Sequence, residues 1–352
     1  MLLYIHIPFC DSKCFYCAFN SYTSLHSLRN DYMDALKIQL ENGLIKYENK
    51  IETIFIGGGT PSTIKAHKYK EIFDIVKPYL VNNCEITIEA NPNSASKEWL
   101  QEIFEIGINR VSFGVQSFDD EKLKFLGRNH NKNQAIEAIK NAKEVGFENI
   151  NCDIIYDTQL DSRELLEKDI SIIKNLPINH ISAYSLTIEE GTKFFNKSSV
   201  QVENEELARF LFEQFNDLGF EQYEISNFSK GENARSKHNL GYWQYKEYLG
   251  VGSGAVGCME NQRQYSQKDV QKYIENPLEL ETYENLTNED ILIEKILLGF
   301  RSVVGVDISS FDDIRKKRVD ILLKEEKITK IDNMIYANDF MLADELSLYL
   351  DI

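Results

Sequence analysis

Three closely spaced cysteines near the start of the chain could bind a metal cluster. Cys10, Cys14 and Cys17 form a CxxxCxxC pattern on a loop that follows an apolar run. Thiolates are the ligands of iron–sulfur clusters, and close spacing on a loop lets several sulfurs converge on one four-iron cube. Three thiolates leave one iron open to a chelating substrate or cofactor. The alternative is a structural zinc with His6 as a fourth ligand, and the spacing favours the cluster because zinc sites prefer CxxC pairs.

The other cysteines, the net charge and the distribution of apolar residues indicate which classes of protein the chain does not resemble. The other cysteines, Cys84, Cys152 and Cys258, stand among apolar neighbours, and we expect them to be small core side chains. The formal net charge of −17 repels phosphate, which argues against broad nucleic-acid binding. The sequence contains no run of 18 or more apolar residues, the length that a membrane-spanning helix needs, and no basic leader precedes the cysteines. We therefore expect a cytoplasmic protein that is not integral to a membrane.

Six short apolar runs in the first half of the chain are predicted to be strands. They are Leu2–Ile7, Thr53–Ile56, Glu85–Glu89, Arg110–Val115, Asn151–Ile155 and His180–Leu186. Amphipathic stretches typical of helices lie between them, such as residues 31–44, 69–79, 133–145 and 165–176. Because parallel neighbours require helical crossovers, this alternation predicts an α/β fold with an incomplete (β/α)6 barrel. Functional residues of such barrels lie at the carboxyl ends of the strands.

The second half of the chain has a different pattern. We expect a helix over Glu203–Leu218, a strand over Gln222–Asn227 and an irregular stretch over Ser229–Gln267. Two helices, Glu289–Phe300 and Phe311–Leu323, and a hairpin around 328–336 then predict a small winged-helix-like unit. The basic run at residues 315–318 is interpreted as a solvated helix face. The expected organisation is a barrel domain over 1–190, a connecting region over 191–287 and a winged-helix-like C-terminal domain over 288–352.

The stretch from Tyr4 to Cys17 resembles the signature of the radical S-adenosylmethionine (radical SAM) superfamily. Within it, the stretch is similar to the oxygen-independent coproporphyrinogen III oxidase group. The resemblance covers nearly the whole chain and implies a [4Fe–4S] cluster on Cys10, Cys14 and Cys17. It also implies that S-adenosylmethionine chelates the open iron, and that an electron from the cluster cleaves its C–S bond to give a 5′-deoxyadenosyl radical. An electron donor is implied as a partner.

The resemblance also assigns cofactor contacts, mostly at the ends of the predicted strands. They are Tyr4, Tyr16, Gly57, Gly58, Gly59, Thr60, Glu89, Gln116, Arg128 and Asp153. Glycines of the GGGTP-like loop let the backbone approach the methionine part of the cofactor. Glu89 resembles the acid that binds the ribose hydroxyls, and the Arg128 guanidinium could pair with the cofactor carboxylate. The turn at residues 156–160 departs from the Gly-Leu-Pro-Gly pattern of the family, which puts its contacts in doubt.

Three features favour the HemW-type haem chaperone branch over the true oxidase. Phe19 stands where the oxidase pattern has a further cysteine, and only nine residues precede Cys10, which leaves no N-terminal arm. The segment from His238 to Trp243 resembles the HNxxYW motif of the chaperone type. The expected function is therefore a chaperone that binds haem and transfers it to an acceptor protein. The rivals are the radical oxidase, which removes propionate carboxyls from coproporphyrinogen III, and a radical enzyme acting on another substrate.

A haem iron needs an axial donor, and His238 beside aromatic residues is the first candidate, in the region 191–287. The alternative is that His238 holds the surrounding stretch in place through hydrogen bonds. Cys258, Met259 and His180 are other possible donors. The sequence leaves these possibilities open.

Overall fold

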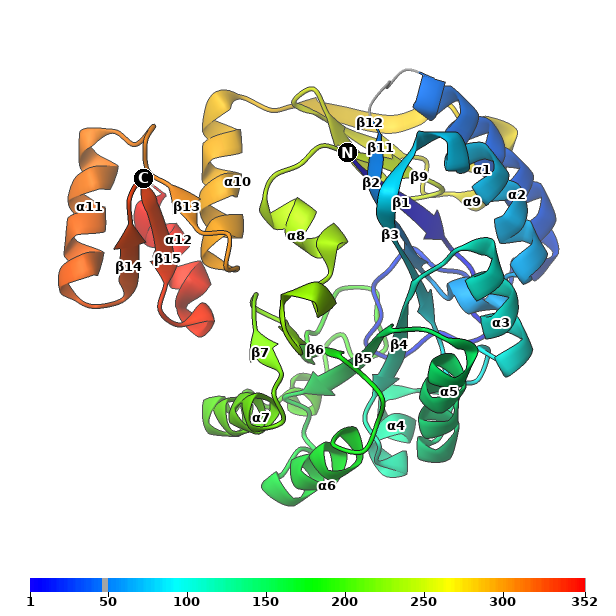
Figure 1. Cartoon of the computed structure of the whole chain (residues 1–352), viewed down its shortest axis with the longest axis horizontal. Coiled ribbons are helices and arrows are strands. Elements are labelled where there is room, and N and C mark those ends of the chain that lie inside the picture. Colours follow the sequence, from blue (N-terminus) through cyan, green and yellow to red (C-terminus); the bar gives the residue numbers. More distant parts are fainter. Residues whose placement is uncertain (46–49, 352) are drawn as a thin grey trace.

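The fold is built on one mixed sheet. The computed structural model describes residues 1–45 and 50–351, and its centre is a 12-stranded sheet (Figure 1). In sheet order the strands are β12 (Leu280–Asn285), β11 (Gln262–Ser266), β10 (Val256–Met259), β9 (Tyr248–Val251), β1 (Leu2–Ile7), β2 (Ile51–Gly58), β3 (Leu80–Ala90), β4 (Arg110–Gln116), β5 (Asn149–Tyr156), β6 (His180–Ser185), β8 (Asn227–Ser229) and β7 (Glu221–Gln222). Strands β1 to β6 pair in parallel, which confirms the predicted (β/α)6 core.

Helices cover the outer face of the parallel strands (Figure 1). In chain order they are α1 (Arg29–Ile45), α2 (Ala66–Val76), α3 (Lys97–Ile106), α4 (Asp120–Leu126), α5 (Lys132–Val145), α6 (Arg163–Ile173) and α7 (Glu205–Asp217). Helix α5 shows why these segments form helices: Ala135, Ala138, Ile139 and Ala142 are buried at the spacing of one helix face. Asn131 caps its first turn. The strands between the helices are almost continuously buried, as expected of a parallel sheet.

The stretch predicted to be irregular, Ser229–Gln267, is in fact well structured. It contains α8 (Lys237–Trp243), β9, β10 and β11, and β9 pairs in parallel with β1. The prediction was wrong because α8 is short and because β11 is largely polar, so neither has a clear apolar period. The predicted strand Gln222–Asn227 is also wrong: its ends belong to β7 and β8, which pair antiparallel across a turn.

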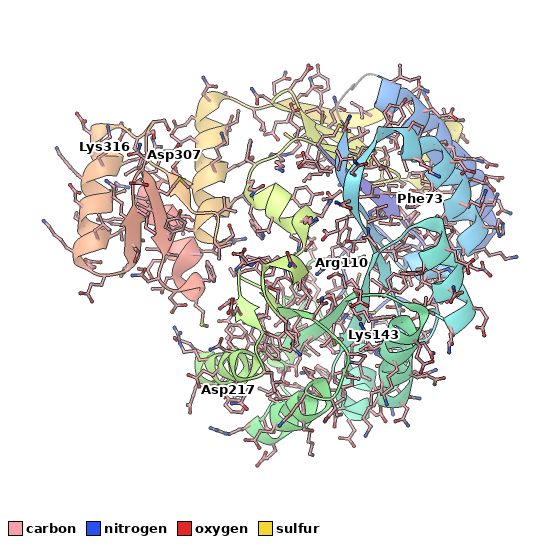
Figure 2. All side chains as sticks on the ribbon, in the orientation of Figure 1. Phe73, Arg110, Lys143, Asp217, Asp307 and Lys316 are labelled. Atoms are coloured by element: carbon pink, nitrogen blue, oxygen red, sulfur yellow. The ribbon has the colours of Figure 1, made fainter. Side chains whose placement is uncertain are left out.

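Helix α8 closes the amino-terminal end of the parallel strands. The His238 backbone N–H donates to Glu85 Oε1 over 3.0 Å, and His238 Nδ1 lies 2.7 Å from Thr53 Oγ1. Arg110, labelled in Figure 2, is buried at the start of β4 and donates to the Ala234 carbonyl over 2.9 Å. These polar contacts fasten α8 to β2 and β3, and the turn that precedes α8 to β4. The carboxyl end of the barrel lies at the opposite edge of the sheet.

The C-terminal part of the chain has its own small sheet and core. It comprises α10 (Asn288–Phe300), β13 (Val306–Asp307), α11 (Asp313–Lys324), β14 (Ile328–Ile331), β15 (Met334–Ala337) and α12 (Ala343–Leu350), with the sheet order β13-β15-β14. Ile296, Phe300, Val319 and Ile335 belong to a hydrophobic cluster separate from that of the barrel. The predicted two helices and hairpin are confirmed, whereas β13 and α12 were missed.

The basic run in α11 differs from the prediction at one residue. Lys316 and Lys317 are exposed, as expected of a solvated face, and Figure 2 shows Lys316 at the outer edge of this unit. Arg315 is buried and forms ion pairs with Glu289 and Asp312. Separately, no helix in the described part of the chain is both long and apolar enough to cross a bilayer.

Candidate functional site

The loop after β1 and the carboxyl ends of β2 to β6 enclose a cavity of about 410 Å³. Most of the predicted site residues line it: Cys10, Cys14, Tyr16, Cys17, Gly58, Gly59, Thr60, Glu89, Gln116, Arg128 and Asp153. Tyr4, Gly57 and His238 do not line it. The parallel strands bring these distant residues together because their carboxyl ends share one edge of the sheet.

The cysteine loop is fixed to the barrel through its backbone and its sulfurs. The Cys10 N–H donates to the Tyr22 carbonyl over 3.1 Å. Thr60 Oγ1 donates to Cys10 Sγ over 3.3 Å, and Arg128 Nη1 donates to Cys14 Sγ over 3.1 Å. Burial raises the pKa of both Cys10 and Cys17. Donors of this kind stabilise thiolates that burial alone disfavours.

The donor set fits an iron–sulfur cluster better than a single ion. Among the described residues, no three Cys, His, Asp or Glu side chains converge on a point that could hold one metal ion. In a four-iron cluster each thiolate binds a different iron, so the three sulfurs that line the cavity need not converge on one point. His6, the alternative zinc ligand, lies 2.9 Å from Tyr4 Oη through Nδ1 and 2.9 Å from the Asn20 carbonyl through Nε2. Its two ring nitrogens are therefore occupied away from the cysteines.

The two glycines that end β2, Gly57 and Gly58, make room for Glu89. A Cβ at Gly57 would lie 2.9 Å from Glu89 Oε2, so a larger residue would displace that carboxyl group. Gly58 has a φ of +111°, which side-chain-bearing residues rarely adopt, and its N–H donates to Glu89 Oε2 over 3.1 Å. Gly57 thus lies behind the cavity wall and acts on the site through Glu89.

Two partly buried carboxyl groups, Glu89 and Asp153, face the cavity from β3 and β5. Burial, together with the nearby charge of Asp153, raises the pKa of Glu89 to about 8. Burial raises the pKa of Asp153 to about 6, although hydrogen bonds oppose the rise. Asn151 Nδ2 donates to Asp153 Oδ1 over 2.6 Å, and Ser112 Oγ donates to the same oxygen over 3.4 Å. A protonated Glu89 can both donate and accept a hydrogen bond, as paired hydroxyls of a ligand require.

Arg128 is held rigidly at the centre of the site. Its Nη2 donates to Asn91 Oδ1 over 2.6 Å and to the Gly114 carbonyl over 2.5 Å. Its Nη1 reaches Cys14 and, over 3.4 Å, Tyr16 Oη. Its Nε is buried and has no hydrogen-bond partner among the described residues. A buried donor without a partner is costly in a protein and fits a site that a ligand completes.

Sequence reasoning missed several residues of this cavity. Asn91 lies two residues after Glu89 in the same motif, so a closer reading of that motif would have included it. Tyr184, Ser185 and Thr187 line the cavity at the end of β6. The sequence located this strand end, but only the fold shows that its side chains face the cysteines.

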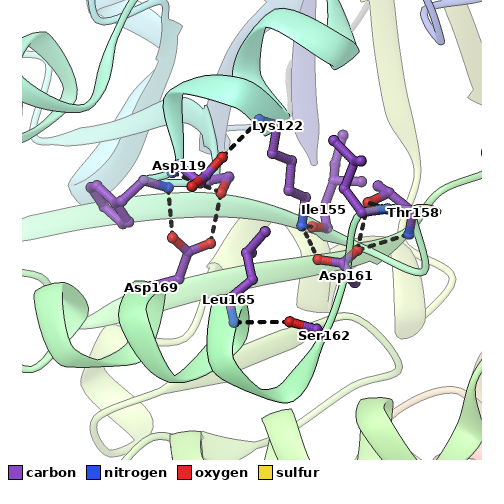
Figure 3. A network of polar contacts seen from close by, with 11 residues as sticks. Asp119, Lys122, Ile155, Thr158, Asp161, Ser162, Leu165 and Asp169 are labelled. Atoms are coloured by element: carbon purple, nitrogen blue, oxygen red, sulfur yellow. Dashed lines mark hydrogen bonds and ion pairs between the residues drawn. The ribbon is translucent and has the colours of Figure 1, made fainter.

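The atypical turn after β5 is held by a buried ion pair (Figure 3). Lys122 and Asp161 are both buried and pair with each other, and Lys122 Nζ also donates to the Ile155 carbonyl over 2.7 Å. Asp161 Oδ2 accepts from the Thr158 backbone N–H and from its hydroxyl, each over 2.8 Å. Ile155 lines the cavity. This network therefore supports the cavity wall from behind.

Tyr4 and His238 lie inside the barrel, behind the cavity. Their rings flank Phe55, with centroid distances of 6.3 Å for Tyr4 and 5.2 Å for His238. His238 is 1% exposed, and its ring nitrogens lie 2.7 Å from Thr53 Oγ1 and 3.1 Å from Tyr242 Oη. An iron ligand needs one nitrogen to be available, so this arrangement fits the structural alternative for His238 and not the ligand role.

The other possible iron donors differ in their surroundings. His180 is buried and both its ring nitrogens are hydrogen-bonded, to Asn151 and Tyr223. Met259 packs in the main hydrophobic core, together with Cys84 and Cys152. Cys258 instead lines a second cavity, beyond α8.

Comparison with known proteins agrees with this geometry. The family model described as "Radical SAM superfamily" matches residues 4–194. A protein named "Heme chaperone HemW" from Bacillus subtilis is 34% identical, over 90% of this chain and 87% of its own length. The protein of the same name from Escherichia coli is 38% identical, over 72% of this chain and 69% of its own. Among solved structures, coproporphyrinogen III oxidase (HemN) from E. coli superposes with a TM-score of 0.84 at 18% identity, covering 99% of this chain and 89% of that one. At that identity the likeness is one of fold.

Proposed function

Because the chain belongs to the radical SAM superfamily and to its HemW group, we propose that it is a haem chaperone that binds haem and passes it to an acceptor protein. The observation that carries the proposal is the similarity to named heme chaperones over nine-tenths of the chain. The cavity supports it, because cluster cysteines and polar strand ends of the radical SAM pattern meet there.

We infer that Cys10, Cys14 and Cys17 hold a [4Fe–4S] cluster and that S-adenosylmethionine binds beside it. When bound, the cluster supplies one-electron reduction of S-adenosylmethionine. Thr60 and Arg128 hydrogen-bond the cysteine sulfurs and so favour their thiolate form. Glu89 is placed to bind the ribose hydroxyls of the cofactor, since its carboxyl group faces the cavity. Gly58, Gly59 and the partnerless Arg128 Nε offer backbone and side-chain polar groups to the methionine part.

The rival function, oxygen-independent coproporphyrinogen III oxidase, gains no specific support here. The structural match to the E. coli oxidase has 18% sequence identity and therefore supports a shared fold, not a shared activity. Phe19, which stands in place of the additional cysteine of the oxidase pattern, lines the cavity and is 67% exposed. An apolar ring at this rim gives no further cluster ligand.

One experiment separates the two functions. Protein reconstituted anaerobically with iron and sulfide is titrated with haem and then mixed with the apo form of a b-type haem protein. The chaperone should bind about one haem per chain and restore the absorption spectrum of the acceptor. The same preparation is incubated with coproporphyrinogen III, S-adenosylmethionine and a chemical reductant, where we expect no protoporphyrinogen. Absence of haem binding, or steady decarboxylation of coproporphyrinogen III, would refute the proposal.

The proposal includes two protein partners and a place in the cell. The acceptor is a haem protein in its apo form, and an electron donor is needed if the cluster is to be reduced. We place the chain in the cytoplasm, where a reducing environment keeps cluster thiolates available.

A further inference from the structure

A second cavity, of about 550 Å³, lies between α8, the antiparallel strands and α10. It shares no lining residue with the cysteine cavity. In Figure 1, α10 stands beside α8, at the junction of the barrel and the C-terminal part. Its volume lies within the range of about 300–1,000 Å³ that is typical of pockets for small organic ligands.

One wall of this cavity is a row of side chains on the antiparallel strands. Cys258 on β10 is paired with Tyr248 on β9 and with Arg263 on β11. Directly paired residues project from the same face of a sheet, so the three side chains form a row. All three line the cavity. Cys258 thus faces a cavity, whereas Cys84 and Cys152, the other cysteines outside the cysteine loop, pack in the main core.

The other walls are mostly aromatic and aliphatic. Tyr242 from α8 packs edge-on against Tyr248, with centroids 4.8 Å apart. Trp243 follows on the same helix, and Leu297 from α10 also lines the cavity. The Trp243 indole N–H is buried and has no hydrogen-bond partner among the described residues, although buried Trp usually finds one. The walls therefore suit a flat apolar ring that also carries a hydrogen-bond acceptor.

Charged groups also line the cavity, and several of them are paired with each other or with neighbours. Arg263 Nη2 donates to both carboxylate oxygens of Glu294, over 2.7 and 2.8 Å, and Lys246 Nζ donates to Glu52 over 2.6 Å. Arg263 is also the strand neighbour of Cys258. Burial raises the pKa of Cys258, and the positive charge of Arg263 opposes that rise. A cation at this position favours a thiolate once a metal binds the sulfur.

We propose that this second cavity is the haem site and that Cys258 is the ligand of the haem iron. The inference rests on the proposed chaperone function and adds the site to it. Thiolate is one of the axial ligands that proteins use for haem, and flat aromatic walls suit the macrocycle. On binding, Cys258 gives its proton to solvent and its sulfur donates an electron pair to the iron. Tyr242, Trp243 and Leu297 would hold the ring, and the exposed Lys246 would be available to its carboxylates.

Two variants test the ligand and the cavity separately in the full-length protein. Cys258→Ser removes the thiolate, and its control is Cys84→Ser, a cysteine of similar burial in the main core. Leu297→Trp fills the cavity, and its control is Leu348→Trp, at a position that is 72% exposed. Each protein is titrated with haem and examined by absorption and electron paramagnetic resonance. Thermal melting and iron–sulfide content are measured in parallel to verify folding.

The expected results are specific to each variant. Cys258→Ser should shift the Soret band and remove the signature of thiolate-ligated ferric haem. Cys84→Ser should keep the wild-type Soret position and the thiolate signature. Leu297→Trp should weaken haem binding by about tenfold or more, whereas Leu348→Trp should not. If Leu297→Trp does not fold, the spectra of Cys258→Ser alone test whether this cavity is the haem site. Wild-type spectra and affinity in both test variants would overturn the assignment of this site, while leaving the chaperone function intact. Absence of haem binding by the wild-type protein would overturn the chaperone function itself.

Discussion

Arg128 donates a hydrogen bond from Nη1 to the sulfur of Cys14 over 3.1 Å. The same guanidinium donates from Nη2 to Asn91 Oδ1 over 2.6 Å, so one planar group joins the cysteine loop to the end of β3. Only arginine offers several N–H groups in this fixed fork, and lysine has a single flexible ammonium. The cysteine loop and the proposed S-adenosylmethionine site are thereby held in one geometry.

The first prediction concerns this fork. Arg128→Lys keeps the charge but loses the planar geometry, and we expect S-adenosylmethionine binding to weaken by about 1–3 kcal/mol. Anaerobic calorimetry on the reconstituted protein measures the affinity. The matched control is Arg163→Lys, because Arg163 on α6 is largely exposed, is paired with Glu167 and does not line the cysteine cavity. Equal affinity in Arg128→Lys and wild type would remove Arg128 from the site.

The second prediction concerns the cluster ligands. Replacing any one of Cys10, Cys14 and Cys17 with Ala should abolish the cluster, because a second iron then lacks its thiolate ligand. Reconstituted wild-type protein should contain about four iron and four sulfide per chain. Cys84→Ala, in the main core, should retain that content. Zinc in the purified protein in place of iron, or cluster loss in Cys84→Ala, would contradict the assignment.

The third prediction is a pH dependence of stability that arises from Glu89. Its folded-state pKa is raised to about 8, mainly by burial, whereas an unfolded Glu titrates near pH 4.3. Between these values the folded protein binds more protons than the unfolded chain, so the free energy of unfolding falls as pH rises and levels off above about 8. The Glu89→Gln variant lacks this proton. Its stability relative to wild type should therefore increase from about pH 5 to pH 8, as measured by urea unfolding. The exposed control Glu102→Gln should show no such trend, and a flat difference for Glu89→Gln would contradict the prediction.

The sequence predicted the parallel half of the fold for a physical reason, and most of the residues it singled out line the cysteine cavity. Strands buried on both faces are continuous apolar runs, and β1 and β4 have this pattern. Their carboxyl ends share one edge, and this is where Glu89, Gln116 and Asp153, which the family resemblance had assigned, come together. Arg128 and the cysteines lie on loops, where the motif and not the periodicity identified them.

The antiparallel strands and their cavity could not be predicted in the same way. β11 consists of Gln262, Arg263, Gln264, Tyr265 and Ser266, and β12 is almost wholly exposed, so neither shows an apolar period. The environment of Cys258 depends on which strands pair with it and on where α10 packs, and these contacts are distant in the sequence. A cysteine among apolar neighbours therefore predicts burial but does not reveal the cavity beside it.

The fourth prediction concerns the buried pair under the atypical turn after β5. Lys122→Met leaves Asp161 buried without its cation, and we expect a loss of about 3–5 kcal/mol in the free energy of unfolding. Lys70→Met is the control, because the Lys70–Asp74 pair is exposed and should change stability by less than about 1 kcal/mol. Urea unfolding at neutral pH measures both. A loss no greater than in the control would show that the turn does not depend on this pair.

The last prediction distinguishes the two roles considered for His238. The ring bridges Thr53 Oγ1 and Tyr242 Oη, so His238→Ala should leave buried hydroxyls without partners and lower the free energy of unfolding by about 1–3 kcal/mol. Because both nitrogens are engaged, we expect the Soret band of the haem-bound variant to match that of wild type. His238→Gln, which can keep one of the two hydrogen bonds, should recover part of the stability. A shifted or lost Soret band in both variants at full cluster content would instead make His238 the iron ligand, and it would then have to leave both partners when haem binds.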